Sequence, residues 1–513
     1  MSPSAREYAI WVVWGGAMLP LALLYMTIPP SPDQSQFDWM AFSAIQGLPY
    51  YAGSFDMNWP GAMWLHEAGI RLFGVHAWTW RLTDFLLLMG FALAGAAFLK
   101  RAGWPLASVL FLWLYPPLYV TSGGWMAGQR DIISAGFLLV SCALALPGSR
   151  REKTACFIAG TCGAAAVLIR PTYLSFLAGL ILLEMLPKGL FAPRGPNRLG
   201  RATWFFLGFA ALLGLAVLSG WALGNLDDWY QQSIEFSLST YVGDPPQVWT
   251  ETLSTLFLWS WHWVTALGLV GLVLWLARDG LTYPLILILG ILATVTVSFF
   301  FQNKFFGYHM GGALMVMALL AGIAFDGLAQ QRRKMQASLR RQAVTSALLL
   351  AVCLAVAGMA GKLLNLQSGL TLLLAGTFGP QPGYGLTEQE RRTIIAMIQD
   401  GSTGQDTVAV YGTKYDLAYR AQRAPTYRFF TPAADQISPA FEHHDAWLTE
   451  IRTALRDTPP AFVIMAKNGA AAAPSGSGAP GGSIRALLEA HVSQGHRVVF
   501  TNDALTVYKA EVP

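Results

Sequence analysis

The sequence predicts a polytopic α-helical membrane protein with a small α/β domain after its last span. First, 54% of its 513 residues are hydrophobic and only 12% are charged, whereas a soluble domain carries roughly a quarter charged residues. Second, apolar runs of about 20 residues, the length that crosses a bilayer, recur through the first three-quarters of the chain. Third, the composition turns polar after about residue 378, where short strands alternate with helices.

The apolar runs predict about eleven transmembrane helices. The first is expected to be retained, because no small-residue cleavage site follows it. The break at Arg170-Pro171 is the least defined, since 154–187 could form one tilted pair or a hairpin. The four cysteines fall inside these runs without CxxC spacing, which favours helix packing over disulfides or a metal site. The predicted spans are 8–28, 82–99, 104–121, 132–147, 154–169, 172–187, 203–223, 254–277, 281–301, 307–326 and 343–363.

Positive charge sets the predicted orientation. Sixteen of the 34 Lys and Arg residues fall in connections on one side, six fall on the other, and the rest lie in the tail. By the positive-inside rule the first side is cytoplasmic. The charge is scattered over short loops instead of forming one basic stripe, so nucleic acid is not an expected partner.

Two domains are predicted: a transmembrane domain (1–377) with a long first outer loop (29–81), and an α/β domain (378–513). In the loop, residues 61–73 have the helical spacing of an interfacial helix. A second outer loop (224–253) could serve as a lid or as a connector. The tail starts with a capping box at Thr387 and Glu390, and a helix should follow it. No GxGxxG or P-loop occurs there, so nucleotide binding is not indicated.

Four short stretches on the predicted outer face carry the candidate chemistry. Ionisable groups at membrane depth are costly and are therefore functional candidates. Arginine forks and lysine charges suit phosphate oxygens, and an aspartate could take a proton from an attacking hydroxyl. The candidates are Asp38 and Asp56 as catalytic acids, Arg130, Arg170, Lys304 and His309 as phosphate ligands, and Gln129, Asp131, Gln302 and Tyr308 as supporting residues.

Each candidate also has a structural interpretation. An aspartate in a loop is often a helix cap, and Arg170 and Lys304 could extend to the lipid headgroups. Arg130 and Asp131 could form a local ion pair at a helix start. His309, beside an apolar span, could be a packing histidine.

Several of these residues stand in short motifs. Asp38 comes early in the first outer loop and is followed by Leu-Pro-Tyr-Tyr (48–51), Asp-x-x-x-Pro-Gly (56–61), Leu-Phe-Gly (72–74) and Arg81. Gly-Gln-Arg-Asp (128–131) and Gln-Asn-Lys-Phe-Phe-Gly-Tyr-His (302–309) come later. With these motifs the chain resembles bacterial glycosyltransferases of the GT-C superfamily, a group that includes protein mannosyltransferases and lipid A aminoarabinose transferases.

The resemblance implies a multi-pass protein of the bacterial inner membrane, with its active site and tail in the periplasm. It implies transfer of a sugar, with inversion, from a polyprenyl-phosphate carrier to a glycan, lipid or protein acceptor. Asp38 would be the base, and Asp56 would orient the acceptor. Arg130, Arg170 and Lys304 would neutralise the departing phosphate. A divalent cation is left open, with Asp38 and Asp56 as its ligands if one binds. One departure is Pro60-Gly61, where many relatives carry two prolines.

Two other functions stay open. An oligosaccharide ligase would use a lipid-pyrophosphate donor with closely related chemistry. A transporter or flippase of a lipid-linked sugar would need charged or broken helices at mid-membrane and an internal repeat. The candidate charges instead gather at one face, and the sequence has no clear repeat.

Overall fold

The computed structural model describes residues 3–147, 151–185, 198–241, 247–334, 386–431, 434, 441–467 and 483–511. The chain divides into two compact units. The helical unit comprises Met1–Ile28, Asp84–Leu215 and Gln247–Ser368. The mixed unit comprises Pro29–Thr83, Ala216–Pro246 and Gly369–Pro513, so the first loop groups with the tail and not with the spans.

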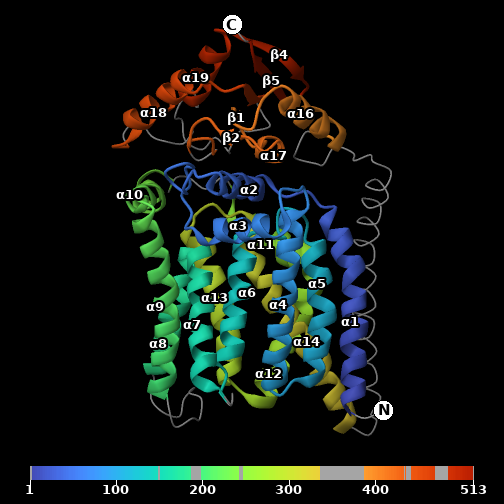
Figure 1. The fold of residues 1–513 in the computed structure, drawn as a ribbon. Helices are drawn as coiled ribbons and strands as arrows, with labels where there is room; N and C mark the ends of the chain where they lie inside the picture. The colour runs from blue at the N-terminus through green and yellow to red at the C-terminus, as the bar shows by residue number, and fades with distance from the viewer. Residues whose placement is uncertain are drawn as a thin grey trace. The chain divides into compact units, whose positions relative to one another are not determined.

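The helical unit is a bundle of long apolar helices (Figure 1). Every predicted span up to residue 326 overlaps a helix, and the predicted span 343–363 lies outside the described residues. Within the described residues, five helices are long and apolar enough to cross a membrane, or six if one bent pair is a single span. The helices are α1 (Pro3–Met26), α4 (Thr79–Arg101), α5 (Pro105–Thr121), α6 (Arg130–Ala145), α7 (Glu152–Ile169), α8 (Leu174–Met185), α9 (Arg198–Ala222), α11 (Trp249–Ser254), α12 (His262–Asp279), α13 (Tyr283–Phe301) and α14 (Gly311–Lys334).

One predicted span is wrong in shape. The sequence predicts a single helix over 254–277, but the chain bends by 87° between Trp249–Ser260 and His262–Asp279. The last turn before the bend is a π-helix (Thr255–Ser260), and the φ angle of Trp261 is −117°. A π-helical turn interrupts the regular hydrogen-bond ladder, and such interruptions are a known cause of sharp bends. An apolar run alone carries no sign of it.

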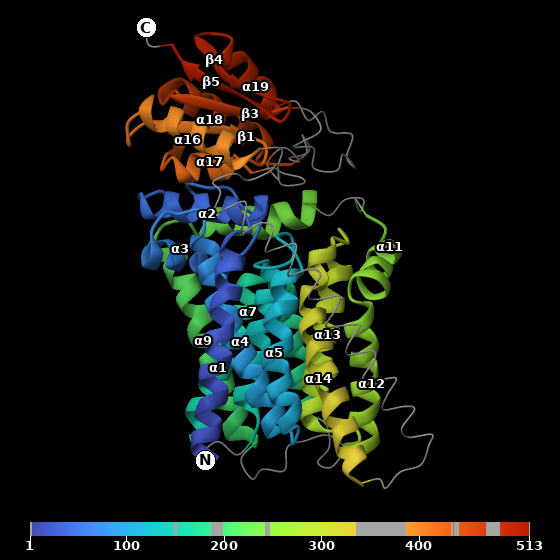
Figure 2. The same ribbon diagram turned by 90° about the vertical axis from the view of Figure 1, so that its right-hand side faces the viewer.

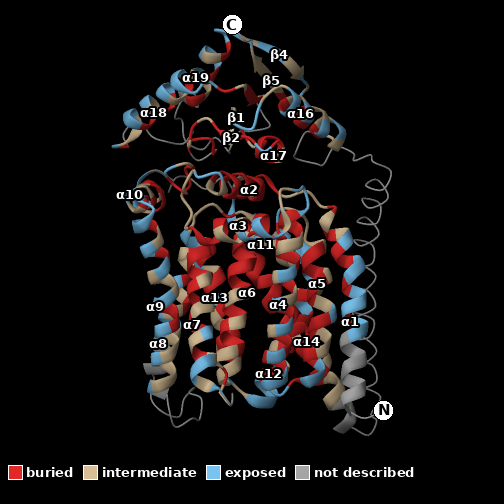
Figure 3. Cartoon of the chain, viewed as in Figure 1, coloured by how far each residue is buried: buried red, intermediate tan, exposed pale blue. Residues whose placement is uncertain are grey.

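Small residues let helices of the bundle approach closely. A Cβ on Gly271 of α12 would stand 1.8 Å from the backbone oxygen of Leu320 in α14, and one on Gly160 of α7 would meet Phe205 of α9 equally closely. Helices in membranes associate largely through such packing of small residues. Buried residues are dense on α6 and α14 (Figure 3). Helix α6 begins with the candidates Arg130 and Asp131, and His309 lies in the 3-10 turn before α14.

The first loop of the mixed unit folds as two helices, as predicted, α2 (Pro32–Ile45) and α3 (Gly61–Phe73). Ser31 caps α2 through a capping box with Gln34, and Pro32 occupies the first turn. The segment 224–241 forms α10 (Leu226–Tyr230) and two π-helical turns, Gln231–Glu235 and Ser237–Tyr241. Gln232 of this segment donates to the carbonyl of Tyr51 at 2.8 Å and accepts from the N–H of Asp56 at 3.0 Å, so it braces the first loop.

The tail is the predicted α/β fold, built on a five-stranded sheet of order β2-β1-β3-β5-β4 (Figure 2). Strand β1 pairs in parallel with β2 and β3, and β5 pairs antiparallel with β3 and β4. The central strand β3 is buried along its whole length. The elements are α16 (Glu388–Asp400), β1 (Thr407–Tyr411), α17 (Tyr415–Arg420), β2 (Ala424–Pro425), α18 (His444–Asp457), β3 (Phe462–Ala466), α19 (Ser483–Val492), β4 (His496–Thr501) and β5 (Leu505–Ala510).

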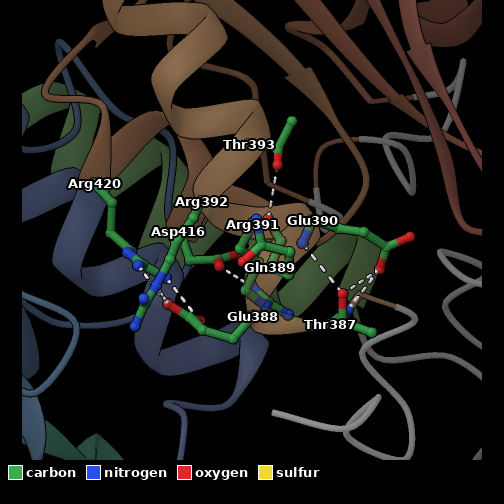
Figure 4. A network of polar contacts seen from close by, with 9 residues as sticks. All are labelled: Thr387, Glu388, Gln389, Glu390, Arg391, Arg392, Thr393, Asp416 and Arg420. Carbon is green, nitrogen blue, oxygen red and sulfur yellow. Dashed lines mark hydrogen bonds and ion pairs between the residues drawn. The ribbon is translucent and has the colours of Figure 1, made fainter. Parts of the chain in front are cut away.

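The start of α16 confirms the predicted capping box and adds an ion-pair network (Figure 4). Glu390 accepts from the N–H of Thr387 at 2.7 Å, and the Thr387 hydroxyl accepts from the N–H of Glu390. Arg420 of α17 pairs with Glu388 at 2.8 Å. We call Glu388, Arg391, Arg392, Asp416 and Arg420 the tail network; it ties α16 to α17.

Candidate functional site

The helical unit gathers the predicted phosphate ligands of three separate segments. Arg130 is the first residue of α6, Arg170 ends α7, and His309 lies in the 3-10 turn Gly307–Met310 before α14. Their residue exposures are 9%, 7% and 3%. The charges of Arg130 and Arg170 both act on His309 and on Asp131. We call Arg130, Asp131, Arg170, Gln302 and His309 the cation cluster.

Asp131 is the counter-charge of the cluster. Its carboxylate is fully buried and pairs with the Nε of Arg170 at 3.0 Å. The Tyr173 hydroxyl donates to the backbone carbonyl of Asp131 at 2.9 Å. Asp131 therefore pairs with Arg170, 39 residues along the chain.

Arg170 does not reach out to headgroups, because it is buried and paired within the bundle. Its backbone explains this placement. Proline at 171 disfavours a helical residue before it, and Arg170 is extended, with φ −140° and ψ 94°. The helix thus ends at Ile169, and the arginine side chain turns into the bundle towards Asp131.

Several buried side-chain atoms of the cluster lack a hydrogen-bond partner among the described residues, the carboxylate oxygens of Asp131 among them. The Nη2 of Arg170 and the Nδ1 of His309 are buried and have no hydrogen-bond partner among the described residues. Buried polar atoms are nearly always bonded, so such atoms call for an explanation. Guanidinium N–H groups donate well to the oxygens of an anion. The planar guanidinium can bind two oxygens of one phosphate at once.

Lys304 follows α13, in a turn with unusual backbone geometry. Asn303 and Phe305 on either side of it have φ angles of 50° and 56°. Non-glycine residues rarely adopt this left-handed conformation, and for a bulky residue it marks strain. The hydroxyl of Thr252 donates to the carbonyl of Phe305 at 2.8 Å and helps to hold the turn.

The supporting residues frame the same end of the bundle. Gln129 is the N-cap residue of α6 and is 1% exposed. Gln302 is the C-cap residue of α13 and donates to Ser298 at 2.8 Å. Tyr308 stacks between Phe306 and Trp125, with ring centroids 5.5 and 6.3 Å away.

The mixed unit holds both predicted catalytic acids, in different surroundings. Asp38 lies inside α2, 4% exposed, and Ser31 is the residue that caps this helix. Asp38 is therefore no cap. Its Oδ1 lies 2.7 Å from the Nδ1 of His66 in α3. The His66 ring stacks on Trp80 with centroids 3.5 Å apart and planes 11° from parallel.

His66 is the functional candidate that sequence reasoning missed. It stands on the buried face of an amphipathic helix, where a histidine is usually a packing residue. A possible signal was its position: His66 comes three residues after Met63 and four before Ile70, so it lies on the apolar face of 61–73. Burial lowers the pKa of His66 below its ordinary value, against the opposing attraction of Asp38. The ring is then neutral at pH 7, and its Nδ1–H donates to the carboxylate.

Asp56 has the contacts of a turn-stabilising carboxylate. Its Oδ2 accepts from Gln36 at 2.6 Å, and its Oδ1 accepts from the backbone N–H of Asn58 at 2.6 Å. A carboxylate that bonds the N–H two residues on is typical of an Asx turn. Within the described residues, no group of three or more His, Cys, Asp or Glu side chains could hold a metal ion. A catalytic or metal-binding role for Asp56 stays a prediction.

Comparisons with known proteins bear on the fold. No protein-family profile matches the sequence, and no curated protein is significantly similar to it. Among solved structures, ArnT from Cupriavidus metallidurans bound to undecaprenyl phosphate matches with a TM-score of 0.60 and 15% identity, covering 97% of each chain. ArnT in the apo state matches with 0.60 and 13%, covering 98% of each chain. The chain has the fold of ArnT.

An archaeal oligosaccharyltransferase, AglB from Archaeoglobus fulgidus, matches with a TM-score of 0.46 and 13% identity over 90% of this chain and 70% of its own.

The ArnT match confirms the fold that the resemblance to the GT-C superfamily predicts. It extends over nearly the whole of both chains, so it includes the tail as well as the helices. The likeness carries no residue roles at this identity.

Proposed function

We propose that this chain is an inverting glycosyltransferase that moves a sugar from a polyprenyl-phosphate carrier to an acceptor outside the cytoplasmic membrane. The cation cluster carries the proposal, because it holds two buried arginines, and the Nη2 of Arg170 is buried without a hydrogen-bond partner among the described residues. In support, one solved protein of this fold, ArnT, binds undecaprenyl phosphate. The acceptor is a cell-envelope glycan, a glycolipid or a protein.

In the proposed reaction, the acceptor hydroxyl oxygen attacks the anomeric carbon of the sugar. The bond from that carbon to the phosphate oxygen breaks, and the electron pair leaves with the polyprenyl phosphate. The leaving phosphate gains one negative charge, which Arg130, Arg170 and Lys304 would neutralise. The hydroxyl proton goes to the carboxylate of Asp38, whose other partner is the Nδ1–H of His66.

The test is sugar transfer by the purified full chain from a panel of polyprenyl-phosphate sugars. Asp38→Asn keeps the size of the side chain and removes the base, so donor binding should survive while transfer falls by about 10²-fold or more. The matched control is Asp33→Asn, the same change in the first turn of the same helix, which should transfer like the wild type. Equal transfer by Asp38→Asn and the wild type would remove Asp38 as the base.

The panel also separates the alternatives. Lipid-pyrophosphate oligosaccharides are included because a ligase would use them in preference to the monophosphate donors. Movement of a lipid-linked sugar across proteoliposomes without transfer would identify a transporter. Either result would overturn the proposed reaction.

A further inference from the structure

A buried carboxylate of the helical unit lies outside the proposed site and carries no role so far. Asp84, near the start of α4, is 0% exposed. The hydroxyl of Tyr25 in α1 donates to its Oδ2 at 2.5 Å, and the hydroxyl of Tyr119 in α5 donates to its Oδ1 at 2.6 Å. Three helices that neighbour one another in Figures 1 and 2 thus meet at one acid.

The second tyrosine connects this acid to the loop before α6. The Tyr119 hydroxyl accepts a hydrogen bond from the backbone N–H of Gly128 at 2.8 Å. A phenol has one proton, and the proton of Tyr119 is directed to Asp84. The lone pairs of Tyr119 are therefore held in a fixed direction, towards Gly128.

Gly128 is the pivot of the loop that presents Arg130. Its φ angle is +79°, a conformation that glycine adopts without steric cost. Gln129 then caps α6, and Arg130 is the first helical residue. The chain of contacts from Asp84 through Tyr119 to Gly128 ends two residues from a member of the cation cluster.

We propose that Asp84 and Tyr119 are positioning residues, which hold the Gly128–Asp131 loop in the geometry that binds the phosphate of a lipid-phosphate donor. This rests on the proposed function. A buried acid in a membrane helix is costly, and an apolar side chain would pack three helices at lower cost. The function of the acid in this proposal is to orient the Tyr119 hydroxyl, which it does by accepting the hydroxyl proton.

The structure supplies a matched control. Tyr25 binds the other oxygen of Asp84 and is equally buried, whereas the hydroxyl that bonds the N–H of Gly128 belongs to Tyr119. Tyr25→Phe and Tyr119→Phe each remove one hydroxyl from the same carboxylate. Both variants should lose similar thermal stability, but only Tyr119→Phe should alter the loop.

The experiment measures binding of undecaprenyl phosphate, and the KM and kcat of transfer, in wild type and both variants of the full chain. Tyr119→Phe should weaken lipid-phosphate binding and raise the donor KM by about 3- to 10-fold, the worth of one hydrogen bond, with kcat less affected. Tyr25→Phe should stay within about twofold of wild type. If Tyr119→Phe does not fold, Asp84→Asn, which keeps the shape, takes its place with the same expectation.

Equal donor KM values for Tyr119→Phe and Tyr25→Phe, with an active wild type, would overturn this inference alone. A wild type that neither binds undecaprenyl phosphate nor transfers sugar would overturn the proposed function, and this inference with it. The two failures are distinguished by the wild-type measurement.

Discussion

The cation cluster of the helical unit and the tail network both contain arginines and acidic side chains, and they differ in whether their buried polar atoms have hydrogen-bond partners. Each pairs buried or half-buried arginines with carboxylates, as Arg170 with Asp131 and Arg420 with Glu388. In the cluster, buried side-chain atoms of Asp131, Arg170 and His309 lack a hydrogen-bond partner among the described residues. Within the described residues, no buried side-chain atom of the tail network lacks a hydrogen-bond partner.

This difference is the one expected between the proposed phosphate-binding cluster and a network that only stabilises the fold. A network that only holds helices together is stable when every donor meets an acceptor, because an unmatched buried polar atom costs free energy. A group that receives an anion keeps donors for it and carries this cost until the ligand binds. The comparison predicts that equal substitutions in the two regions have unequal consequences.

The largest difference is expected for the arginines. Arg170→Gln removes a positive fork and leaves the buried Asp131 without its partner, so transfer should fall by about 10²- to 10³-fold and donor binding should weaken. Arg420→Gln breaks the pair with Glu388 in the tail and should leave transfer near the wild-type rate. Transfer assays with both purified variants, at equal donor concentration, measure the contrast. Equal losses in the two variants would contradict the distinction between the regions.

The second largest effect on the transfer rate is expected for substitutions of His66, in the mixed unit. His66→Leu removes the bond to Asp38, and a hydrogen bond to a charged group is worth roughly 1.5–3 kcal/mol, about 10- to 100-fold in rate. His66→Asn places an amide N–H near the position of Nδ1 and should restore most of kcat. Donor KM should change little in either variant. If His66→Asn is as slow as His66→Leu, an amide donor does not replace the imidazole, and the proposed role of His66 as a hydrogen-bond donor to Asp38 is wrong.

The smallest effect on transfer is expected at Lys414 of the tail, which has no proposed role in the reaction. Its burial as a cation instead lowers the stability of the fold. Lys414 is 2% exposed; burial, with a further contribution from the charge of Arg391, lowers its pKa to about 8. Between about pH 8 and its ordinary pKa of 10.5 the unfolded chain binds more protons than the folded chain, so stability should rise with pH in this window. The rise should be about 3 kcal/mol. Below pH 8 both states are protonated and the contribution is constant.

Thermal unfolding of the full chain at pH 7 to 10 tests this expectation. Lys414→Met should be more stable than wild type at pH 7, and the difference should shrink as the pH rises. Transfer by Lys414→Met should match the wild type. A difference that is constant across this range would show that Lys414 titrates as in water.

Much of the fold follows from local signals in the sequence. Apolar runs place the helices up to residue 326, because each span must satisfy its own backbone within lipid. The capping box at Thr387 and Glu390, the helix over 61–73 and the α/β character of the tail also follow, since each depends on neighbours within a few residues. The bend at Trp261 does not, because a π-helical turn leaves no clear trace in hydropathy.

The candidate site divides in the same way. The sequence by itself determined which residue types stand at the ends of the spans, so Arg130, Arg170, Lys304, His309 and Asp38 could be named from it. Only the tertiary structure decided that Asp131 pairs with Arg170, that His66 holds Asp38, and that two tyrosines meet at Asp84. These partners are 28 to 59 residues apart along the chain. Contacts over such separations depend on how helices pack against one another, and the local pattern around each residue does not encode that packing.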